Sequence, residues 1–82
     1  MKVSILNKDW EINDITFQQR RKLHKSFMKY AFEKDSDVIY DCYQMALEIS
    51  GINPDDLGDY TDLQIDSLLD AITTAYLNLE KK

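Results

Sequence analysis

The pattern Thr-x-x-Gln occurs twice in this chain of 82 residues, at Thr16 to Gln19 and at Thr61 to Gln64. In such a capping box the threonine hydroxyl accepts a hydrogen bond from the first helical turn, and the glutamine side chain accepts one from the threonine backbone. Apolar residues follow both patterns at spacings of three and four. The sequence therefore predicts helices over about 17–33 and about 61–79, each with an apolar stripe that must pack on something.

A third helix is predicted over about 37–50. Asp35 and Asp37 can cap its start, and Gly51 supplies the left-handed residue that commonly follows a helix. The dipeptide Asn53-Pro54 then predicts a short helical turn over about 54–57, because asparagine is a good cap and proline fits the first turn. The buried stripe of this third helix is expected to hold Val38, Cys42, Met45 and Ile49.

The first residues alternate apolar and polar side chains, which is typical of strands. Val3 and Ile5 lie on one flank of the polar turn 7–9, and Trp10 and Ile12 lie on the other, so we expect a β-hairpin over about 2–13. A lone hairpin is marginal in water and must lie on the helices. The predicted fold is α+β, a single domain over 1–82 in which the hairpin packs on a three-helix bundle. The alternative is an all-α three-helix domain with an unpaired N-terminal segment.

Charge is divided unequally along the chain, whose net charge is −5. Residues 18–34 hold six basic residues and one acidic residue, whereas 35–70 hold ten acidic residues and no lysine or arginine. The two halves either neutralise each other at weak surface pairs, or recruit an oppositely charged partner or a second copy of the chain.

The first helix is predicted to have an apolar side and a basic side. Its apolar stripe is formed by Leu23, Phe27, Tyr30 and Ala31. The opposite side presents Arg21, Lys22, Lys25 and Lys29, and Arg20 lies nearer the edge of the apolar stripe.

The sequence contains no pattern typical of an enzyme or of a cofactor site. His24 is the only histidine and Cys42 the only cysteine, so one chain cannot build a zinc cluster from them, and a buried Cys42 needs no reactivity to explain it. The acidic segment 55–66 lacks the spacing of a calcium loop, and the two glycines are isolated. We therefore expect a non-enzymatic protein without cofactor or metal.

The basic side of the first helix is the best candidate for a binding surface. Nucleic acid could use it, but the acidic segments would repel a phosphate backbone, so we expect a protein partner and leave a homo-oligomer open. Aromatic residues off the main stripes could add apolar contacts, or could simply seal the helix ends. The predicted partner-binding residues are Arg20, Arg21, Lys22, Lys25, Lys29, Phe32, Tyr40 and Tyr43.

No run of about 18 apolar residues occurs, and the N-terminus turns polar after Leu6, so neither a membrane span nor a signal peptide is expected. A single cysteine suits a reducing compartment. We therefore expect a cytoplasmic protein with no membrane partner.

The opening of the chain resembles that of tail assembly chaperones from tailed bacteriophages and related small phage proteins. The likeness is carried over residues 3–24 by a short apolar strand, a polar turn and the segment WEINDITFQQRRKLH, with a vaguer likeness in TDLQIDSLLDAI. The resemblance implies a hairpin leading into a capped helix, and a protein that holds tape-measure or tail-tube subunits during assembly in the host cytoplasm. The alternative function is a small nucleic-acid-binding transcriptional regulator that uses the same basic face.

Overall fold

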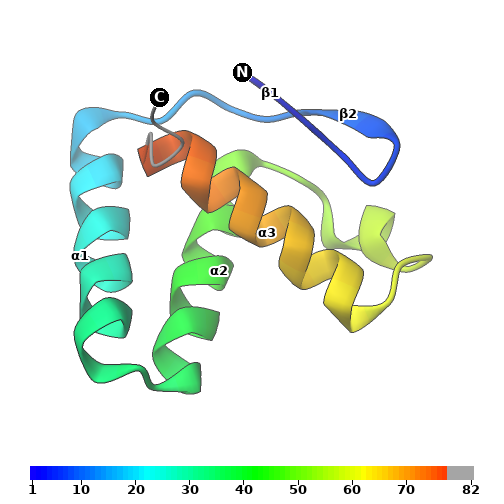
Figure 1. Ribbon diagram of the computed structural model, residues 1–82. Coiled ribbons are helices and arrows are strands. Elements are labelled where there is room, and N and C mark those ends of the chain that lie inside the picture. The colour runs from blue at the N-terminus through cyan, green and yellow to red at the C-terminus, as the bar shows by residue number, and fades with distance from the viewer. Residues whose placement is uncertain (78–82) are drawn as a thin grey trace.

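The computed structural model describes residues 1–77, in which a two-stranded antiparallel hairpin is followed by three α-helices and one 3-10 turn (Figure 1). The α+β prediction is confirmed, and the paired strands overturn the all-α alternative. The expected helix end at Leu79 lies outside the described residues. The elements are β1 (Lys2–Ile5), β2 (Lys8–Glu11), α1 (Phe17–Glu33), α2 (Ser36–Ser50), η1 (Pro54–Leu57) and α3 (Asp62–Leu77).

The hairpin turns at Leu6 and Asn7, earlier than the predicted turn over 7–9. Both residues have positive φ angles, 58° and 60°, as in the two-residue turns that suit strand twist. The resulting register places Val3 opposite Trp10, so two apolar side chains share the face that meets the helices. A turn over 7–9 would have placed Val3 opposite a polar residue instead. Burial of this apolar pair therefore decides the register in favour of a turn that begins with a leucine.

The helix starts follow the predicted caps. At α1, the Thr16 amide donates to Gln19 Oε1 at 2.9 Å and the Gln19 amide donates to Thr16 Oγ1 at 3.1 Å. The same reciprocal pair joins Thr61 and Gln64 before α3, at 2.9 and 3.2 Å. Asp35 caps α2, which begins at Ser36, one residue before the predicted start. Lys34 ends α1 in the left-handed conformation, which the sequence did not indicate.

The core lies where the three helices and the hairpin meet. α2 packs on both α1 and α3, and α3 also contacts β1. Helix α1 enters the core mainly through Leu23, which is fully buried, while Ala31 is exposed and does not extend the apolar stripe as predicted. Leu23, Phe27 and Tyr30 already span the contact, and Ala31 falls beyond its edge. The buried hydrophobic residues are Val3, Trp10, Ile12, Leu23, Cys42, Ala46, Leu57, Leu68, Leu69, Ile72 and Tyr76.

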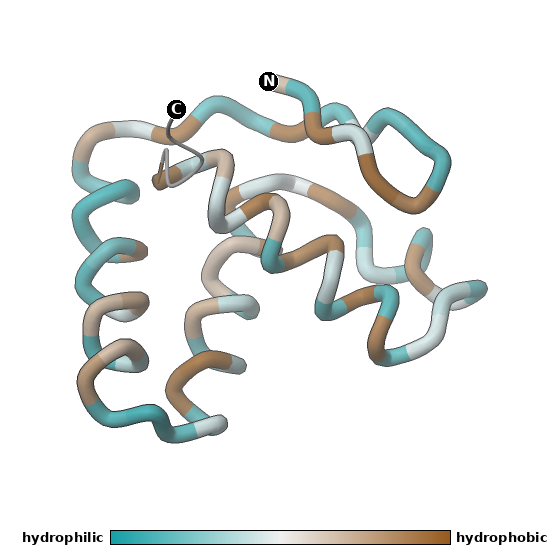
Figure 2. Tube along the Cα trace, viewed as in Figure 1, coloured by the Kyte–Doolittle hydropathy of each residue, from teal (hydrophilic) through white to brown (hydrophobic). Residues whose placement is uncertain are grey.

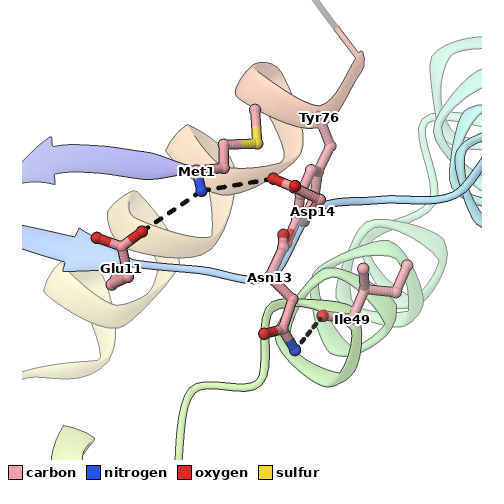
Figure 3. A network of polar contacts seen from close by, with 6 residues as sticks. All are labelled: Met1, Glu11, Asn13, Asp14, Ile49 and Tyr76. Carbon is pink, nitrogen blue, oxygen red and sulfur yellow. Dashed lines mark hydrogen bonds and ion pairs between the residues drawn. The ribbon is translucent and has the colours of Figure 1, made fainter.

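The segment between the hairpin and α1 is fixed to both other helices at Asn13 (Figure 3). The backbone N–H of Asn13 donates to the Ser50 carbonyl at 2.9 Å, and the side-chain Nδ2 of Asn13 donates to the Ile49 carbonyl at 3.3 Å. Both acceptors lie at the end of α2. The Asn13 carbonyl accepts from the Tyr76 hydroxyl of α3 at 2.6 Å. These bonds hold the start of α1 in place relative to the rest of the domain.

Candidate functional site

The five predicted cations all lie exposed on α1. Leu23 fixes the rotation of the helix, because its full burial turns the opposite side of α1 to solvent. Figure 2 shows the result as a predominantly hydrophilic course through the first turns of α1. Several of the cations also border an open depression near the end of α3, of about 570 Å³, which is lined by Phe17, Arg20, Arg21, Lys22, His24, Lys25 and Leu77.

The α1 cations are not neutralised by the acidic half of the chain within the part that the structure describes. Among residues 1–77 the ion pairs are those of the Met1 amino group, with Glu11 at 3.4 Å and with Asp14 at 3.5 Å. Neither involves α1. Of the two interpretations of the charge pattern, the geometry of residues 1–77 therefore favours cations available for contact with another molecule.

Apolar side chains share the solvent side of α1 with the cations. Phe17 is 70% exposed, Met28 is 37% exposed and Phe32 is 80% exposed. Together with Arg21 and Lys25 they follow one line along the helix, since residues three or four apart stand one above another. The guanidinium of Arg21 lies over the Phe17 ring, 5.6 Å from its centre. We call these five residues, Phe17, Arg21, Lys25, Met28 and Phe32, the α1 outer face.

Sequence reasoning missed Phe17 and Met28 as members of this surface. The signal was present, because both stand at helical spacing from Arg21 and Phe32 on the side opposite Leu23. Large apolar side chains so exposed are individually normal, but a continuous line of them interleaved with cations is typical of a contact surface.

Tyr40 and Tyr43 were predicted to add apolar contacts for the partner, and the structure places them on α2, beside acidic residues of α3 rather than beside the α1 cations. The Tyr40 hydroxyl donates to an Asp66 carboxylate oxygen of α3 at 3.4 Å. Tyr43 is half-buried, and burial, together with the negative charges of Asp70 and Asp66, raises its pKa to about 12. Both tyrosines therefore belong to the junction of α2 and α3. The predicted site is therefore divided: its cations lie on α1, and its two tyrosines lie beside the carboxylates of α3.

Cys42 and His24, the only candidates for nucleophile and base, lie in different surroundings. Cys42 is fully buried, and burial raises the pKa of its thiol, although Ser26 and Thr73 hydrogen bonds oppose this. A thiol in such surroundings is a weak nucleophile. His24 is exposed on α1. Within residues 1–77 no group of three histidine, cysteine or acidic side chains could hold a metal ion.

None of the helices within residues 1–77 has the length and apolarity needed to span a membrane. Comparison with known protein families, curated proteins and solved structures gives no match. The likeness to phage tail assembly chaperones therefore rests on the residues of this chain alone.

Proposed function

We propose that this chain is a non-enzymatic interaction module that binds a partner protein through the α1 outer face. The observation that carries the proposal is the exposed line of Phe17, Arg21, Lys25, Met28 and Phe32 on one side of a helix, whose two cations form no ion pair within residues 1–77. Aromatic residues, methionine and arginine are enriched in interfaces, and arginine and aromatic anchors supply much of their energy. The surface therefore fits a partner segment that offers acidic and apolar side chains together.

The way α1 is held supports binding at low entropic cost. A capping box fixes its start, Leu23 anchors its middle, and the Asn13 bonds to α2 and α3 fix the segment that enters it. A helix held in this way need not be ordered when the partner arrives, so less of the contact energy is lost.

The most specific form of the proposal is a phage tail assembly chaperone or a related phage accessory protein, acting in the host cytoplasm. It is supported by the resemblance over residues 3–24, which includes the hairpin, the Thr16 cap and the first cations of α1. The partner would then be a tape-measure or tail-tube subunit, held by reversible contacts until assembly.

The test compares capture of these subunits by the native chain and by a variant carrying Arg21→Glu, Lys22→Glu, Lys25→Glu and Lys29→Glu. All four side chains are exposed, so the midpoint temperature of thermal unfolding should change little while capture is lost. A matched control with Lys22→Arg, Lys25→Arg and Lys29→Arg keeps the charge and should retain capture. Undiminished capture by the glutamate variant would remove α1 from the site.

The second candidate function is a nucleic-acid-binding regulator, which the same exposed cations would favour. Its distinguishing property is salt dependence, because each phosphate contact releases counterions. Titration against duplex and single-stranded DNA at two salt concentrations separates the two functions. Tight binding with a steep salt slope supports the regulator, whereas absence of binding at both concentrations leaves the protein partner.

A further inference from the structure

A second exposed surface lies at the junction of α2 and α3. Leu63 is 80% exposed at the start of α3, and Tyr40 of α2 is 55% exposed beside Asp66. Asp66, Ser67 and Asp70 share one side of α3 with Leu63, since they follow it at three, four and seven residues. We call these five residues, Tyr40, Leu63, Asp66, Ser67 and Asp70, the acidic face.

The acidic face and the α1 outer face are complementary in both apolarity and charge. Each presents large exposed apolar side chains, and each carries charge of one sign: Arg21 and Lys25 on α1, Asp66 and Asp70 on α3. Opposite potentials across a contact favour association and fix its register. The cations of one face would meet the carboxylates of the other while the apolar side chains leave water.

One copy of the chain cannot bring its own two faces together. α1 lies at one side of the domain, and η1 with the first turns of α3 lies at the other (Figure 1). In keeping with this, residues 1–77 contain no ion pair between the α1 cations and the α3 carboxylates. Among residues 1–77, the complementary face available to α1 is therefore that of a second copy.

We propose that, without a partner protein, the α1 outer face of one copy docks on the acidic face of a second copy. Pairing α1 with α1 would oppose cations, and pairing two acidic faces would oppose carboxylates, so symmetric contacts are disfavoured. A head-to-tail contact leaves one face of each kind unused, and further copies can add to form a chain or ring. The inference rests on the same α1 outer face as the proposed function, so a second copy and the partner protein compete for it.

The test is sedimentation velocity over a range of protein concentrations up to about 1 mM. In about 0.01 M salt, where charges interact over about 30 Å, the weight-average mass should rise from 9.6 kDa to at least twice this value. In about 1 M salt it should fall back toward the monomer, because the Debye length shrinks to about 3 Å. A native chain that stays at the monomer mass under all these conditions overturns the inference.

Two variants, each altered on one face, give the sharper measurement. Arg21→Glu/Lys25→Glu changes the α1 outer face, and Ser67→Lys/Asp70→Lys changes exposed positions of the acidic face. Each alone should be monomeric, because its two faces then carry charge of the same sign, whereas an equimolar mixture should associate again, because the intact α1 outer face of one variant meets the intact acidic face of the other. A mixture that remains monomeric, while the native chain associates, excludes the head-to-tail contact.

Ser4→Lys/Asp9→Lys is the matched control, since it changes the net charge as much as Ser67→Lys/Asp70→Lys but lies at exposed positions of the hairpin, outside both faces. This control should associate like the native chain. If it loses association as fully as Ser67→Lys/Asp70→Lys does, net charge rather than the acidic face controls association. Leu63→Ser should weaken association without adding charge. Because Ser67→Lys/Asp70→Lys leaves α1 intact, its capture of a tail-tube or tape-measure subunit reports on the proposed function separately.

Discussion

The Tyr76 hydroxyl of α3 donates a hydrogen bond to the carbonyl of Asn13, 63 residues earlier, with an oxygen-to-oxygen distance of 2.6 Å. Tyr76 is 1% exposed, so its hydroxyl depends on this acceptor rather than on water. The same Asn13 donates to the end of α2. Asn13, in an irregular segment, therefore links α2 to α3 and holds the first turn of α1 in position relative to them.

Tyr76→Phe should lower the free energy of unfolding by about 0.5–1.5 kcal/mol, because the hydrogen bond is lost and the Asn13 carbonyl is left with poorer partners. Urea unfolding measures the change. Tyr60→Phe is the matched control and should have little effect, since the Tyr60 hydroxyl makes no hydrogen bond within residues 1–77. Equal destabilisation by both variants would contradict the role given to Tyr76.

Gly51→Ala should destabilise the fold by about 1–3 kcal/mol. Gly51 has φ of 80°, and a Cβ atom there would lie 2.5 Å from Asn13 Nδ2. Gly58→Ala is the control, because Gly58 has φ of −64° and its Cβ would meet nothing closer than the Asp55 carbonyl at 3.6 Å. Adding Asn13→Ala to Gly51→Ala should recover part of the loss, and a purely additive double variant would show that the close approach is unimportant.

Asn13 also illustrates what the sequence could and could not predict. Thr16, Thr61, Gly51 and the hairpin were predictable because caps, left-handed glycines and strand alternation act between near neighbours. The bonds of Asn13 to α2 and α3 were not, because they join residues far apart in sequence and depend on how the helices pack. The turn at Leu6 was missed for a related reason, since burial of Val3 against Trp10 overrode the polar turn signal.

The candidate site was predicted in part. Leu23 is fully buried, so the cations on the other side of α1 are exposed. Helical periodicity alone was enough to predict this arrangement. Periodicity also indicated that Tyr40 lies off the buried stripe, but not which neighbouring helix it would meet. Its placement beside Asp66 required the packing of α2 on α3.

Raising the pH above about 10 should destabilise the protein. Burial, with a smaller contribution from Asp14, raises the pKa of Tyr76 to about 12, whereas an unfolded tyrosine titrates near 10. Its stabilising contribution is thus complete below about pH 10 and is lost between about pH 10 and 12, where the unfolded chain releases the proton first. The loss is at most about 1.4 kcal/mol per pH unit. Unfolding by urea across this range should show a shallower fall for Tyr76→Phe than for the native chain, and parallel curves would contradict this.

Phe17→Ser/Phe32→Ser should weaken partner binding by about 10- to 100-fold, because exposed aromatic anchors supply much of an interface's energy. Both side chains are mainly exposed, so the free energy of unfolding should change by about 0.5 kcal/mol or less. Calorimetric titration with a tail-tube or tape-measure subunit, the proposed partner, measures the affinity. Leu63→Ser removes a similarly exposed apolar side chain from the acidic face and should not weaken partner binding. A larger effect of Leu63→Ser than of the α1 changes would place the site on α3.

The central claim is that the partner covers the α1 outer face, and nuclear magnetic resonance can locate that contact residue by residue. The measurement adds unlabelled tail-tube or tape-measure subunit to the ¹⁵N-labelled Ser67→Lys/Asp70→Lys variant, which is expected to be monomeric. The account predicts that the largest amide shifts fall on Phe17, Arg21, Lys25, Met28 and Phe32, with the hairpin and α3 little changed. Largest shifts on the hairpin or at the junction of α2 and α3, or no shifts with either subunit, would contradict it.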